Sequence, residues 1–201
     1  ATALRFHREG WRVITVSRTP PPGQCPWSLE RSHILLDLSD LGNIIRCIEI
    51  MRGVLEDGEL HALVNNAGIS PKGPGGSRLD SLTTDIETWQ SMYNTNFYAP
   101  LLLTRGFAGE LSRGRGAVIN LTSIAGSRVH KFAGSAYATS KAALAALTRE
   151  MAFDLAPLGD AWRIGVLEIR RLHVAVAVPG RAAPLEPYAV QHAVAEEPVR
   201  R

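Results

Sequence analysis

The stretch from Ser123 to Lys141 has the sequence SIAGSRVHKFAGSAYATSK, and the rest of the chain is best understood outward from it. It follows the apolar run 117–121 (AVINL), which predicts a buried strand, and it leads into the run 142–147 (AALAAL), which predicts a helix. Ser123 therefore places a hydroxyl group at the carboxyl end of the predicted strand. Tyr137 and Lys141 are four residues apart on the predicted helix, so their side chains share one face.

This arrangement suits proton transfer at a small oxygen atom. A Tyr phenol is a poor acid or base at neutral pH because its free pKa is about 10. A nearby cation such as Lys141 favours the phenolate and lowers that pKa. The Ser123 hydroxyl can hydrogen-bond the oxygen that the Tyr137 phenol reaches, which predicts proton exchange with a carbonyl or alcohol oxygen. The simpler explanation is a chance Tyr-x-x-x-Lys, with a half-buried Tyr beside a solvated Lys.

Strands and helices alternate through the preceding part of the chain. Residues 1–9 have the pattern of the second half of a helix, and Gly10 stands where a helix end needs glycine. Apolar runs at 11–16, 33–37 and 60–64 predict strands, and the spacing in 41–55 predicts a helix. Residues 85–111 predict a long helix that Pro100 kinks or splits. Wholly apolar strands alternating with helices predict a single-domain α/β fold with a doubly wound parallel sheet.

Polar or small residues follow each predicted strand. They are Ser17-Arg18, Asp37, Asn65-Asn66-Ala67-Gly68 and Thr122-Ser123. Ligands of doubly wound folds bind at the carboxyl ends of the strands, so these residues together predict a binding site. Each also has a simpler explanation: Arg18 as a solvated loop charge, Asp37 as a turn or helix cap, and the Asn-Asn-Ala-Gly run as a tight turn.

Composition excludes several classes of function. The chain has 201 residues and a net charge of +3, with scattered basic residues and no basic run interleaved with aromatics, so we expect no nucleic-acid partner. No apolar run is long enough to span a membrane, and the N-terminus is charged where a signal peptide is apolar, so we expect a cytoplasmic protein. Cys25 and Cys47 lack metal-ligand spacing, so we expect no metal site.

Four motifs, in this order, resemble the short-chain dehydrogenase/reductase family, in particular its members similar to 3-oxoacyl-[acyl-carrier-protein] reductases. They are Asn65-Asn66-Ala67-Gly68, Asn94-Thr95-Asn96, Leu121-Thr122-Ser123-Ile124-Ala125-Gly126 and Tyr137-Ala138-Thr139-Ser140-Lys141, within residues 1–159. The resemblance implies a Rossmann-like fold and a catalytic tetrad of Asn96, Ser123, Tyr137 and Lys141. Tyr137 would be the general acid in reduction, and Ser123 would polarise the substrate carbonyl. Lys141 would lower the phenol pKa, and Asn96 would hold a water that links Lys141 to solvent, unless it lies on an exposed helix face.

The resemblance also implies a nicotinamide dinucleotide as hydride donor. The residues implied to bind it are Ser17, Arg18, Asp37, Leu38, Asn65, Ala67, Gly68, Tyr137 and Lys141. Arg18 stands where an acidic residue would favour NAD, and an arginine suits a 2′-phosphate, so we expect NADP(H) to be preferred, with NAD(H) as the second choice. The implied substrate is a small carbonyl compound or secondary alcohol, such as a 3-oxoacyl thioester. Family members pair through two long helices, here 85–111 and 137–156, which implies a homodimer or homotetramer.

The two ends of the chain depart from the family. The 201-residue sequence contains no glycine-rich phosphate loop and no counterpart of the family's first strand, so we expect a sheet that lacks its central strand and has unpaired backbone groups on both sides of the gap. The motifs stop at Gly159, and the run 173–180 (HVAVAVPG) is a candidate surrogate for the sixth strand. We expect the domain to span 1–180 and the tail 181–201 to be disordered. These ends suggest a truncation or a shifted reading frame, and a catalytically inactive Rossmann-like remnant is the competing functional hypothesis.

Overall fold

The computed structural model describes residues 2–21, 23, 25, 32–155, 163–168 and 174–179, and within them it forms one six-stranded sheet in the order β2-β1-β6-β3-β4-β5. The strands are β1 (Trp11–Ser17), β2 (His33–Leu35), β3 (Ala62–Asn65), β4 (Ala117–Thr122), β5 (Arg163–Glu168) and β6 (Val174–Pro179). β1 and β2 pair in parallel, as do β3, β4 and β5. The predicted α/β fold with a mainly parallel sheet is confirmed.

β6 runs against the other described strands. It is antiparallel to β1, with Val16 opposite Val174, and antiparallel to β3, with Ala62 opposite Ala177. In the doubly wound order 3-2-1-4-5-6 it takes the place of strand 1. The expectation of an open gap is therefore wrong, because the facing backbone groups of β1 and β3 pair with β6.

The end of the sheet also differs from the expectation. β5 pairs in parallel with β4, with Thr122 opposite Glu168, and forms the edge beyond it. The interpretation of residues 173–180 as a surrogate sixth strand is wrong in its location, because Val174–Pro179 lies in the middle of the sheet. The predicted disordered tail, 181–201, lies outside the described residues, as does the junction 156–162.

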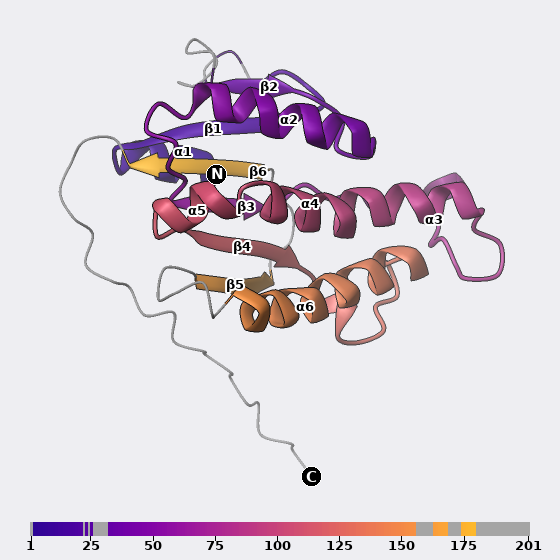
Figure 1. Ribbon diagram of the computed structural model, residues 1–201. Helices are drawn as coiled ribbons and strands as arrows, with labels where there is room; N and C mark the ends of the chain where they lie inside the picture. The colour runs from indigo at the N-terminus through magenta and orange to yellow at the C-terminus, as the bar shows by residue number, and fades with distance from the viewer. Residues whose placement is uncertain are drawn as a thin grey trace.

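Figure 1 shows most of the helices on one face of the sheet and α1 on the other. The helices are α1 (Thr2–Arg8), α2 (Leu41–Val54), α3 (Ile86–Tyr93), α4 (Ala99–Gly106), α5 (Ala108–Arg113) and α6 (Ser135–Leu155), with short turns η2 (Pro74–Gly76), η3 (Asn94–Tyr98) and η4 (Ile124–Gly126). The core packs Ile14 and Val118 of the sheet against Ile44 of α2 and Phe107, which precedes α5. Gly10 ends α1 with φ +82, in the left-handed conformation that its predicted position requires.

The predicted long helix 85–111 is divided in two places. A π-helical turn, η3, separates α3 from α4, and the backbone N–H of Ala99 donates to the carbonyl of Asn94, five residues earlier. Pro100 itself lies in the first turn of α4 and does not split the helix there. Proline has no N–H and its ring crowds the carbonyl four residues before it, so the irregular turn falls just N-terminal to it. The second break is at Phe107.

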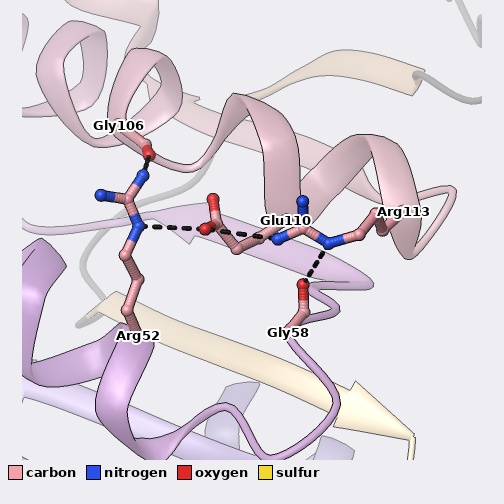
Figure 2. A network of polar contacts seen from close by, with 5 residues as sticks. All are labelled: Arg52, Gly58, Gly106, Glu110 and Arg113. Carbon is pink, nitrogen blue, oxygen red and sulfur yellow. Dashed lines mark hydrogen bonds and ion pairs between the residues drawn. The ribbon is translucent and has the colours of Figure 1, made fainter.

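A buried carboxylate joins α2, α5 and the turn before β3, as Figure 2 shows. Arg52 donates to Glu110 Oε1 at 2.9 Å and to the Gly106 carbonyl at 2.6 Å. Arg113 pairs with the same oxygen at 3.4 Å and donates to the Gly58 carbonyl at 2.9 Å. Burial opposes ionisation of Glu110, but its own backbone N–H and the two guanidinium groups outweigh burial, so its pKa lies below the ordinary value. The network holds these helices near the amino ends of the parallel strands. The polar residues that follow the strands lie at the opposite, carboxyl ends.

Candidate cofactor and catalytic site

A cleft of about 160 Å³ opens beside the carboxyl ends of β1 and β3. Its walls come from the residues that follow β1, β2 and β3, and from the π-turn η3. Six of the nine cofactor residues expected from the sequence line it, namely Ser17, Arg18, Asp37, Leu38, Ala67 and Gly68. The topology thus brings together residues that lie up to 51 positions apart in the chain (68 minus 17).

Asn65 lies beneath this cleft rather than on its wall. Its side chain is 2% exposed, and Nδ2 donates to Asn120 Oδ1 at 2.8 Å. Asn120 in turn donates to Thr148 Oγ1 at 2.9 Å, which links β3 through β4 to α6. The Asn65 side chain therefore links the sheet to α6. Its Oδ1 has no hydrogen-bond partner within the described residues, and Asn65 lines a small void beside the cleft, so its contact with a cofactor stays a prediction.

Asn96 and Lys141 come together against Gly68. A Cβ atom added to Gly68 would lie 3.3 Å from Asn96 Oδ1 and 3.4 Å from Lys141 Nζ. The Asn96 side chain is fully buried, so an exposed helix face is excluded. It accepts from the Ile69 N–H at 2.9 Å and donates to the Ile69 carbonyl and to Ser140 Oγ, both at 3.0 Å. Asn96 therefore holds the loop after β3 against α6.

Lys141 is a buried ammonium group at the end of this cleft. The residue is 4% exposed, and Nζ donates to the Leu121 carbonyl at 2.6 Å. Burial lowers its pKa from 10.5 to about 8, because removal from water disfavours the charged form. Lys141 therefore keeps its charge at neutral pH and loses it in mildly alkaline solution.

The turn η4 brings Ser123 close to the part of α6 that carries Lys141. Ser123 Oγ accepts from the Ala125 N–H at 3.2 Å and so fixes the start of the turn. A Cβ atom on Gly126 would lie 2.8 Å from the Ala142 nitrogen and 2.9 Å from the Lys141 carbonyl carbon. Only glycine permits this approach of backbone to backbone. Tyr137, half-buried, lies one turn before Lys141 on α6.

The pocket residues fit part of a dinucleotide. Thr95 lines the cleft, and its buried hydroxyl has no hydrogen-bond partner within the described residues, so a polar ligand there would supply one. Gly68 lines the cleft and packs closely against Asn96 and Lys141, so a ligand in the cleft would lie next to the residue that contacts the Lys141 ammonium. The pyrophosphate is fitted less well, because the sequence has no glycine-rich turn between a strand and a helix, and β6 begins at this edge instead.

Other kinds of site find no support in the part of the chain that the structure describes. Its His, Cys, Asp and Glu side chains nowhere gather in a group of three or more that could hold a metal ion. None of its described helices has the length and apolar character needed to cross a membrane.

A family model described as short chain dehydrogenase matches residues 1–170. The chain belongs to this family. The short-chain dehydrogenase is 47% identical over 205 residues to Protein FixR of Bradyrhizobium diazoefficiens, covering all of the chain and 69% of FixR. It is 30% identical over 159 residues to the NADPH-dependent 1-acyldihydroxyacetone phosphate reductase of Schizosaccharomyces pombe. That match covers 79% of the chain and 51% of the reductase, so the chain spans about half of this relative's length.

Solved structures resemble the dehydrogenase in the same way. An oxidoreductase of this family from Brucella ovis, in complex with partially ordered NAD, is 52% identical with a TM-score of 0.77, covering 82% of this chain and 74% of that one. A 3-oxoacyl-[acyl-carrier protein] reductase with bound NAD from Brucella melitensis is 26% identical with a TM-score of 0.58. That match covers 68% of this chain and 49% of the reductase. By family, the chain is an NAD(P)-dependent oxidoreductase. The similarity also continues past Gly159, where the sequence motifs stop.

Local sequence patterns do not predict two features of the dehydrogenase site. The unpaired hydroxyl of Thr95 depends on the backbone register of the π-turn η3. The contact of Gly126 with α6 joins residues 16 positions apart (142 minus 126). The polar or small residues after the strands did predict that Ser17, Arg18, Asp37 and Gly68 lie together.

Proposed function

We propose that the chain transfers a hydride between NADP(H) and a carbonyl compound or secondary alcohol, with Tyr137 as the acid and base. The bound nicotinamide supplies or accepts the hydride. The observation that supports this most strongly is the position of Gly68, which lines the cleft and also lies against Asn96 and Lys141. The residues expected to bind the cofactor and those expected to move the proton therefore meet at one point.

In the reductive direction, Tyr137 gives its phenolic proton to the substrate oxygen, and the Ser123 hydroxyl hydrogen-bonds the same oxygen. The Lys141 ammonium, one turn along α6, favours the phenolate that remains. Because burial brings the pKa of Lys141 to about 8, this assistance is present at neutral pH and fades above it. Asn96 keeps Ile69 and Ser140 in place around the ammonium.

Arg18 supports the choice of NADP(H). It follows β1, lines the cleft beside Ser17 and is exposed to solvent, so its guanidinium group is available to a phosphate. Arginine binds phosphate through two parallel N–H donors. The relatives differ in their cofactor: the Schizosaccharomyces pombe reductase is named for NADPH, and the Brucella ovis structure contains NAD.

The test is a fluorescence titration of the chain and its variants with NADPH and NADH. Arg18→Asp should weaken NADPH binding by about tenfold or more, as expected for loss of a charge-assisted phosphate contact, and leave NADH binding equal or tighter. Arg46→Asp, an exposed arginine of α2 outside the cleft, is the matched control and should change neither affinity. An unchanged NADPH preference in Arg18→Asp would contradict the assignment.

The substrate class is proposed to be a 3-oxoacyl thioester or a related ketone. Two loops next to the proton-transfer residues are tied together, since Arg78 donates to the Ala133 carbonyl at 2.7 Å and Lys72 donates to the Phe132 carbonyl. The names of two relatives, an acyldihydroxyacetone phosphate reductase and a 3-oxoacyl reductase, support a ketone on an acyl compound. A screen of such ketones, with NADPH oxidation as the signal, tests the class.

The second candidate is a chain that folds without turning over substrate. It is favoured by β6, which occupies the place of the strand that would lead into the phosphate loop. Gel filtration with NADPH separates the two. Retained cofactor with turnover of a ketone supports the oxidoreductase, whereas a cooperatively folded chain that retains no cofactor supports the inactive remnant.

A further inference from the structure

Thr95 stands out among the polar residues of the cleft. The residue is 5% exposed, and Oγ1 has no hydrogen-bond partner within the described residues. Thr95 lines the cleft and also a small void beside it that is too narrow to hold a water molecule, and Leu38 and Ala67 line both as well. Most buried polar atoms in proteins are paired, so an unpaired hydroxyl at the wall of an empty cleft indicates a missing partner.

Other threonines in the helices of this chain show what Thr95 lacks. Thr104 donates to the Pro100 carbonyl at 2.7 Å, Thr139 to the Ser135 carbonyl at 3.0 Å and Thr148 to the Leu144 carbonyl at 2.7 Å. In each case the acceptor is four residues earlier, which is the usual local partner of a helical threonine. Thr95 makes no such bond.

Thr95 is the second residue of the π-turn η3. Its acceptor four residues earlier would be the Ser91 carbonyl, which lies where the helix changes register and shares the Asn94 N–H with the Gln90 carbonyl. The Thr95 hydroxyl makes no bond to it and stays unpaired at the position where η3 meets the cleft. Such π-turns occur often at functional sites.

We propose that the Thr95 hydroxyl binds the adenosine part of the dinucleotide. This assignment rests on the proposed function. Thr95 shares both the cleft and the void with Leu38, which follows β2 together with Asp37. The family resemblance implies that Asp37 and Leu38 contact the adenine. A hydroxyl group can donate to a ring nitrogen or accept from a ribose hydroxyl, so it suits either part of a nucleoside. Binding would pair a group that is buried and unpaired in the free chain.

Removing the hydroxyl should have opposite effects on folding and on binding. Thr95→Val keeps the shape of the side chain, so the free chain should melt at a higher temperature, because an unpaired buried hydroxyl is gone. NADPH should bind about five- to tenfold more weakly, as expected for one lost hydrogen bond. Adenosine 2′,5′-bisphosphate, which lacks the nicotinamide half, should lose the same factor. Thr95→Ser keeps the hydroxyl and should bind both ligands like the wild type.

Thr148→Val is the matched control. Thr148 is a buried helical threonine whose hydroxyl is paired with Asn120 and the Leu144 carbonyl, so its removal should lower the melting temperature of the free chain. If the wild type binds NADPH and Thr95→Val binds it equally well, the assignment of Thr95 is overturned and the proposed function stands. If Thr95→Val lowers the melting temperature, the hydroxyl has a partner in the free chain and the assignment is also overturned. If the wild type binds neither NADPH nor the bisphosphate, both proposals fall.

Discussion

At the scale of single residues, the most consequential side chain is Lys141, because its burial affects both the stability of the fold and the pKa of its ammonium group. Its ammonium is removed from water by α6, β4 and the loop after β3, and it donates a hydrogen bond to a neutral acceptor, the Leu121 carbonyl. Burial therefore costs folding free energy and, at the same time, brings the pKa down to about 8.

The sign of this cost predicts how stability depends on pH. Between pH 8 and 10.5 the unfolded chain holds a proton on Lys141 that the folded chain has lost, so the free energy of unfolding rises with pH. From pH 7 to 9.5 this group should add about 2 kcal/mol, at 1.36 kcal/mol per pKa unit. Lys141→Met should lack this rise and should exceed the wild type in stability most clearly at pH 7.

Urea unfolding at the two pH values is the measurement. Lys131→Met removes an exposed lysine on a loop and should keep the pH dependence of the wild type. If the free energy of unfolding rises equally with pH in Lys141→Met and in the wild type, the buried ammonium is not the cause of the rise.

At the scale of elements, the packing of η4 on α6 determines where Ser123 lies. The contact is between backbones at Gly126, and it fixes the turn that begins at Ser123 against the helix that carries Tyr137 and Lys141. The geometry between the hydroxyl and the phenol is therefore set by a glycine that touches neither side chain.

Gly126→Ala should disturb this geometry. The new Cβ atom would meet the backbone of Lys141 and Ala142 at less than 3 Å, so η4 must move away from α6, with an expected loss of about 1–3 kcal/mol in stability, typical of overpacking. Ketone reduction should fall more steeply than NADPH binding, because η4 carries no residue that lines the cofactor cleft.

Gly53→Ala in α2 is the control for this change. Nothing lies within 4 Å of its added Cβ atom, and alanine favours helix, so the variant should be as stable as the wild type or more stable. Thermal melts measure the stability of both variants, and steady-state rates measure their ketone reduction. Full activity in Gly126→Ala would show that the position of Ser123 does not depend on this contact.

Much of the arrangement of elements followed from local sequence patterns. The apolar runs placed β1, β3 and β4, the helical spacing placed α2, and Gly10 ended α1 as its position required. The π-turn could not be foreseen, because its backbone register depends on Pro100 together with the packing of α3 and α4. The side chain of Asn65 also escaped local reasoning, since its partner Asn120 is on another strand.

At the scale of the whole molecule, β6 was the hardest feature to predict. The run Val174–Pro179 alternates valine and alanine, which favours a strand but says nothing about its neighbours or its direction. Both are decided by which backbone groups remain unpaired elsewhere, and those belong to β1 and β3. A strand can be recognised from its own residues, whereas its place in a sheet depends on residues far away in the chain.

A proline in β6 tests its central location. Val176 lies opposite Ile14 on one side and Leu63 on the other. Val176→Pro removes a backbone donor from a strand that is paired on both sides, where proline is not tolerated, so cooperative unfolding should be lost. Val176→Thr keeps the donor and the β-branched shape and should melt cooperatively. A sharp thermal transition in Val176→Pro would place residues 174–179 outside the sheet.

The position of β6 also fixes the order of events during synthesis of the chain. The strands β2-β1 and β3-β4-β5 form two groups, and within the described sheet their backbones are hydrogen-bonded to one another only through β6, the last described strand to leave the ribosome. Until then β1 and β3 each present an unpaired edge, and the contact between Ile14 and Val176 must close a loop of 162 residues (176 minus 14). Such distant pairing is slow, and open strand edges invite association with other chains. The nascent dehydrogenase is therefore most exposed to aggregation, and most dependent on chaperones, in the interval before residue 174 appears.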